Sequence, residues 1–309
     1  MENKNILVTG GCGFIGGNFI RFLRDNFPKN TITCLDKCGY ASNFEYIKDY
    51  IDVMITKDIS EDISSVFAIK YDYIFHFAAE SHVDNSIADP TIFVKSNVLG
   101  TQNLLEGFRE ANYGKFIHIS TDEVYGHLGF DDPSFTELTP IAPRSPYAAS
   151  KAASDLLCLS YINTFNCNIS ITRCCNNYGP NQHDEKFIPT IIKSLKNGKK
   201  VPVYGEGMNI REWIHVHDHN LAVWAVAREG KQGVYNIGSG LELTNIELVD
   251  KICCVLGKDL DESVIFVKDR LGHDFRYSID STKIKDELCF EPVYNDFDNQ
   301  LEELVKNYG

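Results

Sequence analysis

Two short stretches of the sequence carry side chains that could move protons. Thr121, Asp122 and Glu123 follow one another directly after a β-branched stretch. Neighbouring carboxyl groups repel each other's charge, so one can stay protonated as an acid while the other works as a base. Tyr147 and Lys151 are separated by three residues and share one face of a predicted helix, where the ammonium can stabilise a tyrosinate. Together these residues predict acid–base chemistry on a bound substrate.

A glycine-rich stretch directly after the first predicted strand could hold a dinucleotide. It reads TGGCGFIG and fits both GxGxxG and GxxGxxG. Such glycines allow a tight turn and let the backbone approach a pyrophosphate at the start of a helix. We therefore expect a cofactor-binding loop made by Gly10, Gly13, Phe14, Ile15 and Gly16.

Acidic residues at two later strand ends extend this prediction. Asp36 lies about 20 residues beyond the glycines, where a carboxylate can accept both hydroxyls of an adenosine ribose. That position favours NAD over NADP. The neighbouring Lys37 leaves NADP open, since a cation could meet a 2′-phosphate, and Asp58 is a candidate for contacting adenine.

Alternating strands and helices must position these side chains. The predicted strands are Asn5–Thr9, Thr31–Asp36, Val53–Lys57, Tyr73–Phe77, Lys115–Ser120 and Ile169–Arg173. The predicted helices between them are Phe14–Asn26, Pro90–Ala111 and Pro146–Phe165. This order predicts an α/β fold with a Rossmann-type, doubly wound parallel sheet that binds ligands at the carboxyl ends of its strands.

The pattern changes to short strands, loops and helices after about residue 175. Helices are expected over residues 184–197, 216–228 and 244–256. We expect residues 1–175 to form the cofactor-binding domain with the catalytic residues, and residues 176–309 to form a smaller α/β lobe that binds substrate, with some chain crossing between them.

Composition excludes several other classes of protein. The 309 residues include 30 basic and 43 acidic ones, a net charge of −13 that argues against nucleic-acid binding. No apolar run approaches the roughly 20 residues that cross a bilayer, and no signal peptide is recognisable, so we expect a cytoplasmic protein. The ten cysteines form no CxxC pair, and we expect them to be reduced, with no metal site.

Taken together, the motifs identify a family resemblance that runs nearly from end to end. The chain resembles the extended short-chain dehydrogenases/reductases that modify nucleotide sugars, most closely the nucleoside-diphosphate-glucose 4,6-dehydratases. The segments that carry it are TGGCGFIG, LDKCGYASN, HFAAESHVDNS, ISTDEVYG, SPYAASKAASD, TRCCNNYGPNQHDEKFIP, REWIHVHDH and DRLGHDFRYSID. The Asp-Glu pair is the most discriminating feature, because related 4-epimerases lack both carboxylates.

The resemblance implies a three-step reaction that regenerates its NAD. Tyr147 would take the C4 hydroxyl proton while NAD accepts the C4 hydride, with Lys151 lowering the phenol's pKa and Thr121 contacting the C4 oxygen. Glu123 would then remove the C5 proton while a protonated Asp122 donates to the departing C6 hydroxyl. The hydride finally returns to C6.

The same resemblance implies further contacts. Ala78, Ala79 and Asn177 would contact the cofactor. Asn97 is expected to help position the catalytic lysine through water and is grouped with the substrate residues. The other expected substrate contacts are Glu80, Ser81, His82, Asn176, Lys186, Phe187, Pro202, Val203, Tyr204, Arg211, Asn245, Arg270 and His273. Asn85 and Asp184 depart from the family pattern, which commonly has arginine and proline there.

Several alternatives stay open. A UDP-sugar 4-epimerase, a UDP-glucuronate decarboxylase and a non-catalytic dinucleotide sensor share the scaffold, and the sequence leaves UDP and dTDP undecided. The family implies a place in deoxysugar synthesis, for example of rhamnose. It also implies a homodimer through a four-helix bundle, formed here by residues 91–111 and 146–165 of each subunit.

Overall fold

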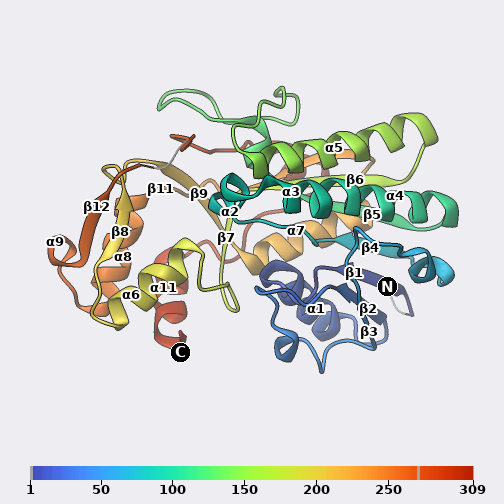
Figure 1. Ribbon diagram of the computed structural model, residues 1–309, viewed down its shortest axis with the longest axis horizontal. Helices are drawn as coiled ribbons and strands as arrows, with labels where there is room; N and C mark the ends of the chain where they lie inside the picture. The colour runs from blue at the N-terminus through green and yellow to red at the C-terminus, as the bar shows by residue number, and fades with distance from the viewer. Residues whose placement is uncertain (1–2, 270–271, 309) are drawn as a thin grey trace.

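A seven-stranded sheet of parallel strands forms the centre of the computed structural model, which describes residues 3–269 and 272–308 (Figure 1). Its order is β10-β6-β5-β4-β1-β2-β3, and every neighbouring pair is parallel. The bounds are β1 (Asn5–Thr9), β2 (Thr31–Asp36), β3 (Val53–Thr56), β4 (Tyr73–His76), β5 (Lys115–Thr121), β6 (Ile169–Cys174) and β10 (Gly233–Ile237). The predicted doubly wound α/β fold is confirmed.

Helices cover both faces of this sheet because its strands bury side chains on both sides. Ile6 and Val8 of β1 join one core with α1 (Phe14–Asn26) and α7 (Val216–Glu229). Leu7, between them, joins a second core with α4 (Gly100–Ala111) and α5 (Pro146–Phe165). The strands are nearly continuously apolar because their side chains pack against a layer of helices on each face of the sheet.

The predicted helix over residues 90–111 is not a single α-helix. It consists of α3 (Pro90–Phe93), a π-helical turn (Val94–Leu99) and α4, while α2 (Val83–Ala88) precedes it. Wide turns of this kind often occur at functional sites. Here the turn carries Asn97, whose side chain exchanges two hydrogen bonds with the Glu80 backbone, at 2.8 and 3.0 Å, and donates to Ser150 Oγ at 2.8 Å.

A smaller lobe is built on a separate core. It contains a three-stranded sheet of β11 (Glu242–Thr244), β9 (Ile210–His215) and β7 (Asn176–Tyr178), and a parallel pair of β12 (Val264–Val267) and β8 (Val201–Tyr204). Its helices are α6 (Phe187–Lys196), α8 (Asn245–Leu256), α9 (Leu260–Ser263) and α11 (Phe297–Asn307). Figure 1 shows β8, β12, α6, α8 and α9 at the opposite end of the molecule from β1–β3.

The second half of the chain also returns to the large sheet. Strand β10 pairs with β6, α7 packs against α1, and α10 (Thr282–Leu288) packs against α7 and β10. Short 3₁₀ turns at Phe44–Tyr46, Ser64–Ala68 and Asp122–Tyr125 complete the regular structure. Within the described ranges, no helix has the length and apolar character needed to cross a membrane.

Helix α5 is held in place by a cap and by buried charges. Ser145 accepts a hydrogen bond from the Ala148 backbone at 3.0 Å, and Pro146 occupies the first turn, as is favoured at helix starts. Further along, buried Asp155 accepts a hydrogen bond from Arg173 on β6 at 2.8 Å and lies 3.3 Å from His118 on β5. Removing one partner of a buried ion pair usually lowers the free energy of unfolding by about 3–5 kcal/mol. The pair therefore favours one placement of the helix on the sheet.

Candidate active site

A cavity of about 590 Å³ lies at the carboxyl ends of the central strands and is lined by residues of both lobes. Its walls include the glycine loop after β1, the strand ends of β2, β4, β5 and β6, the start of α5, and parts of β8 and β9. This is the position at which open α/β sheets bind ligands.

The glycine loop fits the backbone of a dinucleotide because side chains there would collide with main chain. A Cβ on Gly16 would lie 2.4 Å from the Gly10 carbonyl oxygen. Gly10 itself has φ +70°, and a Cβ there would lie 2.5 Å from the Ala78 nitrogen. The loop therefore keeps α1's N-terminus, with its unpaired N–H groups, close to the cavity, as pyrophosphate binding requires.

Asp36 lines the cavity at the end of β2 and is held by backbone donors. Its two oxygens accept hydrogen bonds from the Cys12 N–H at 3.0 Å and the Cys38 N–H at 2.7 Å. The Lys37 ammonium contacts Glu80 at 2.6 Å and Asp58 at 3.8 Å. Because two carboxylates engage this cation, the arrangement favours NAD over a 2′-phosphorylated cofactor.

Asp122 differs from the prediction in one respect: it does not line the cavity. Thr121 and Glu123 do, whereas the Asp122 side chain is only 1% exposed and lies behind the wall. Its Oδ1 accepts a hydrogen bond from Thr121 Oγ1 at 3.1 Å. Among the described residues, no donor reaches Oδ2. The tight 3₁₀ turn at residues 122–125 explains this placement, because it directs consecutive side chains to different sides.

The surroundings of Asp122 favour its protonated form. Burial is the largest influence that raises its pKa well above the ordinary value, followed by the negative charges of Glu123 and Glu212; the Thr121 hydrogen bond and Arg211 oppose them. Glu212 is also buried, and its oxygens accept backbone hydrogen bonds from Gly240 at 2.8 Å and Ile279 at 2.9 Å. The predicted split of neighbouring acids into a proton donor and a carboxylate therefore has a physical cause here.

The expected effect of Lys151 on Tyr147 is not found. Burial and the charge of Glu123 raise the pKa of the Tyr147 phenol well above its usual value. The Lys151 ammonium instead donates to the Ile119 carbonyl at 2.8 Å, and burial lowers its own pKa. Both side chains do reach the cavity, and catalytic hydrogen bonds often form only when the ligands are in place.

Asn97 also lies outside the cavity lining, contrary to its grouping with substrate contacts. Its amide is 1% exposed and is fully engaged with Glu80 and Ser150. Ser150 in turn donates to the Tyr147 carbonyl at 2.7 Å. Asn97 thus links the loop after β4 to the first turns of α5, one residue from Lys151.

The small lobe contributes a cation to the cavity. Buried Arg211 on β9 donates to the carbonyls of Ile210 at 2.7 Å and Asp274 at 3.0 Å, and its guanidinium lies 4.4 Å from the centre of the Tyr277 ring. Lys186 reaches back to the large lobe, where it donates to the Ser81 carbonyl at 2.9 Å. These cations give an anionic ligand a local site in a strongly acidic protein.

Most of the predicted contacts come together at this one cavity. In addition to those described above, the lining includes Gly13, Phe14, Ile15, Asp58, Ala78, Ala79, Glu80, Ser81, His82, Asn176, Asn177, Lys186, Phe187, Pro202, Val203, Tyr204, Asn245 and His273. Arg270 lies outside the described residues. Of the two departures, Asn85 donates to Tyr40 at 3.5 Å, and Asp184 accepts from Lys193 at 2.6 Å.

Sequence reasoning missed Glu212 and Tyr277. Glu212 is more than 80 residues from Asp122, and no local pattern signals that they meet. Tyr277 lines the cavity against the Arg211 guanidinium, and its only sequence signal is its place within the DRLGHDFRYSID segment.

Comparisons with known proteins agree on one family. A sequence model described as GDP-mannose 4,6 dehydratase matches residues 7–306. Agl12, a low-salt glycan biosynthesis protein of Haloferax volcanii, is 47% identical over 310 residues, covering 98% of both chains. A dTDP-glucose 4,6-dehydratase of Streptomyces niveus is 46% identical over 299 residues, covering 93% of this chain and 88% of that protein.

A solved structure shows the same relationship in three dimensions. DesIV, a dTDP-glucose 4,6-dehydratase of Streptomyces venezuelae crystallised with NAD and TYD bound, superposes with a TM-score of 0.92 at 44% identity. The match covers 98% of this chain and 96% of that one.

We predict that Asp122→Asn stabilises the fold at neutral and alkaline pH. The pKa of Asp122 is higher in the folded protein than in the unfolded chain, so wild-type stability falls as pH rises from the unfolded pKa, about 3.8, towards the higher native pKa. The free energy of unfolding of the wild type falls by about 1.4 kcal/mol per pH unit in that window. The amide in Asp122→Asn does not titrate, so the variant does not lose this stability. Denaturant unfolding between pH 4 and 8 measures the difference.

Asp131→Asn, at an exposed position, controls for loss of one negative charge. A stability difference between wild type and Asp122→Asn that does not grow with pH would show that Asp122 is ionised in the folded protein.

Proposed function

We propose a function from one premise: the chain belongs to the nucleoside-diphosphate-glucose 4,6-dehydratase family of the extended short-chain dehydrogenases/reductases. It is an NAD-dependent hydro-lyase that converts a nucleoside-diphosphate-glucose into the 4-keto-6-deoxy sugar. The observation that carries this assignment is the buried Asp122, whose pKa is raised, next to Glu123, Tyr147 and Lys151, which line the cavity.

The first step removes hydrogen from C4. We assign Tyr147 as the base for the C4 hydroxyl and Thr121 as the contact for the C4 oxygen. When bound, NAD supplies an acceptor for the C4 hydrogen and a donor for C6. We assign Lys151, one helical turn from Tyr147, as the source of the positive charge that a tyrosinate needs; burial lowers the pKa of Lys151, and the negative charge of Asp155 opposes that shift.

The second step removes water across C5 and C6. A 4-ketone acidifies the C5 hydrogen, and Glu123 is placed in the cavity wall to take it. A hydroxyl leaves well only when it receives a proton, which Asp122 carries. Because Asp122 lies behind the wall, we propose that its side chain turns towards the cavity when the sugar binds, so that Oδ2 meets the C6 hydroxyl.

We propose dTDP-glucose as the substrate. Several relatives above 40% identity are named for it, and DesIV was crystallised with NAD and TYD bound. The walls formed by Pro202, Val203, Tyr204 and Asn245 would hold the base and sugar, with Arg211 serving the diphosphate. UDP-glucose differs by a methyl on the base and by one pentose hydroxyl.

Other chemistries on the same scaffold fit less well. The 4-epimerases do not need paired carboxylates, and the decarboxylases lack the neighbouring aspartate. A non-catalytic sensor would gain nothing from a buried, protonated acid, which lowers stability. We further propose that the enzyme acts in deoxysugar synthesis, for example of rhamnose. We propose a cytoplasmic location because all ten cysteines are free.

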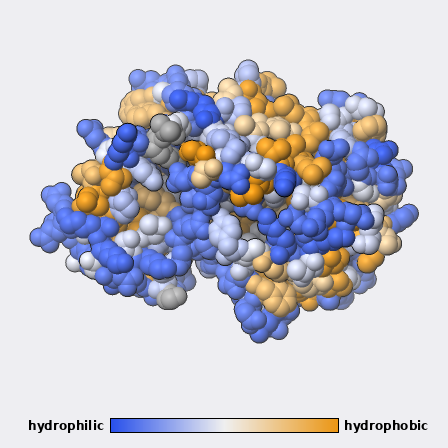
Figure 2. Space-filling model, viewed as in Figure 1, coloured by the Kyte–Doolittle hydropathy of each residue, from blue (hydrophilic) through white to orange (hydrophobic). Residues whose placement is uncertain are grey.

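We also propose a homodimer. Exposed apolar side chains gather along α2, α3, the π-helical turn and α5: Ile87, Ile92, Val94, Leu99, Leu156 and Phe165. Figure 2 shows hydrophobic residues concentrated over α3, α4 and α5. A contiguous apolar patch of this kind marks an interaction surface, and two antiparallel copies would complete a four-helix bundle.

The function predicts that hydrogen migrates from C4 to C6 within one sugar. dTDP-glucose deuterated at C4 should give a 4-keto-6-deoxy product with deuterium at C6, seen by mass spectrometry and NMR. UDP-glucose should react with a kcat/KM about 10- to 200-fold lower, since one missing methyl contact is worth about 1–3 kcal/mol. Tyr147→Phe is the control that should form no ketone. Product without deuterium at C6 would contradict the assigned reaction.

If the protein is a homodimer, the mass of the wild type measured by sedimentation should be twice the chain mass of 34.9 kDa. Leu156→Glu, at a side chain 55% exposed on α5, should dissociate it, because paired glutamates would be buried without partners. Phe266→Glu, on exposed β12, is the matched control. A monomeric wild type in analytical ultracentrifugation would contradict the proposed homodimer.

A further inference from the structure

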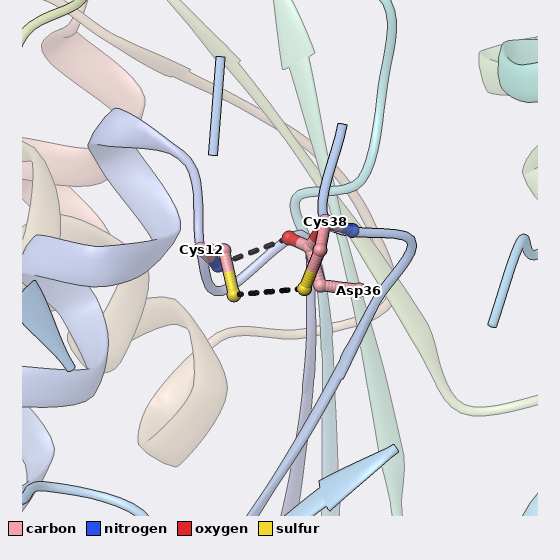
Figure 3. A group of neighbouring side chains, drawn as sticks. All are labelled: Cys12, Asp36 and Cys38. Carbon is pink, nitrogen blue, oxygen red and sulfur yellow. Dashed lines mark hydrogen bonds between the residues drawn. The ribbon is translucent and has the colours of Figure 1, made fainter. Parts of the chain in front are cut away.

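Three potential metal ligands lie together beside the cofactor cavity. Cys12 is in the glycine loop, Asp36 ends β2, and Cys38 follows two residues later (Figure 3). One ligand atom from each lies within 4.8 Å of the other two. They are brought together by the parallel pairing of β1 with β2, which places both strand ends at one edge of the sheet.

The separation of the two sulfurs fits a shared metal. Cys12 Sγ and Cys38 Sγ are 3.9 Å apart. A disulfide needs about 2.05 Å. Two thiolates bound at about 2.3 Å to one tetrahedral Zn²⁺ lie about 3.8 Å apart. The sulfurs therefore already have the spacing of two corners of a tetrahedral site.

The carboxylate is fixed between the two cysteines by their own backbones. Asp36 Oδ2 accepts the Cys12 N–H at 3.0 Å, and Oδ1 accepts the Cys38 N–H at 2.7 Å and the Ser42 hydroxyl at 3.3 Å. Figure 3 shows the Asp36 carboxylate facing both cysteines. Hydrogen bonds that orient a ligand in this way strengthen metal binding.

A cation has a route to the site. Cys12 and Asp36 are buried, whereas Cys38 is exposed and opens the cluster to solvent. The nearest cationic side chain in the sequence, Lys37, directs its ammonium to Glu80 at 2.6 Å and Asp58 at 3.8 Å. The positive charge of Lys37 is therefore largely compensated.

We propose that Cys12, Asp36 and Cys38 bind one thiophilic divalent cation, of the Zn²⁺ or Cd²⁺ class, through two thiolates and one carboxylate. Binding releases the two thiol protons, and the fourth position of the metal takes water. This site departs from the expectation that the cysteines hold no metal. It rests on the cluster alone and needs no part of the proposed function.

A second consequence does rest on the proposed function. If Asp36 accepts the adenosine ribose hydroxyls of NAD, a metal on its carboxylate removes that contact and places a cation next to the cofactor. The metal and NAD should then weaken each other's binding by equal factors, as linkage requires.

The test uses the chelator-treated chain, kept reduced by a phosphine and titrated with Cd²⁺. Sulfur-to-cadmium charge-transfer absorption in the ultraviolet should saturate at one Cd²⁺ per chain, and Zn²⁺ should displace it. Cys38→Ser should weaken binding by more than about 100-fold, because even supporting residues of metal sites contribute 10- to 100-fold. Cys254→Ser, another exposed cysteine, should leave the titration unchanged.

Absence of a one-equivalent band, an unchanged titration in Cys38→Ser, or its loss in Cys254→Ser would overturn the metal site. Repeating the titration with saturating NAD should weaken Cd²⁺ affinity at least tenfold. If Cd²⁺ binds through Cys38 while NAD leaves its affinity unaltered, the metal site stands and the ribose contact of Asp36 is wrong.

Discussion

The crowding of carboxyl groups around Asp122 is the constraint on which the site depends. Burial alone disfavours its charge, and Glu123 and Glu212 add negative charge from two directions. Glu212 belongs to β9 of the small lobe, where the Gly240 and Ile279 backbones hold it, whereas Asp122 follows β5 of the central sheet. The raised pKa of Asp122 therefore depends on residues of both lobes. The cost of a buried neutral acid is acceptable because the reaction needs a proton donor at neutral pH.

The second requirement is a rigid placement of α5, which brings Tyr147 and Lys151 to the cavity. The start of α5 is fixed by the Ser145 cap. Its middle is held by Asp155, which contacts Arg173 on β6 and His118 on β5. Burial tends to raise the pKa of Asp155, but its bond with His118 and the charge of Arg173 hold it below the ordinary value. An ionised Asp155 in turn supports a positive charge on Lys151, four residues earlier on the helix.

Local patterns predicted the parts of this molecule that local physics determines. Four elements, β1, β2, α1 and α5, have the expected bounds, because apolar runs, a glycine turn, helical periods and the helix start at Ser145 and Pro146 define them locally. The π-helical turn was not predicted, since the contacts of its Asn97 with Glu80 and Ser150 are tertiary and leave no local signal in the sequence. The helical pattern of the sequence continues through this turn, so the pattern predicts one α-helix there.

The same limit applies to the chemistry. The Asp-Glu pair indicated opposite protonation states, but which acid is enclosed depends on a short turn and on Glu212 from another lobe. The spacing of Tyr147 and Lys151 suggested direct stabilisation, whereas Lys151 donates to the Ile119 carbonyl. The Cys12–Cys38 pair was equally hidden, because their approach depends on the pairing of two strands.

The most direct test of the account separates sugar oxidation from water loss. In a single turnover with dTDP-glucose and NAD, rapid quenching and mass spectrometry resolve the 4-keto-glucose nucleotide from the 4-keto-6-deoxy product. With Asp122→Asn, the account predicts that the 4-keto-glucose nucleotide accumulates, because oxidation proceeds while elimination slows by about 10²- to 10⁴-fold. Equal slowing of both steps, with no accumulation, would contradict a protonated Asp122 as the acid that releases water.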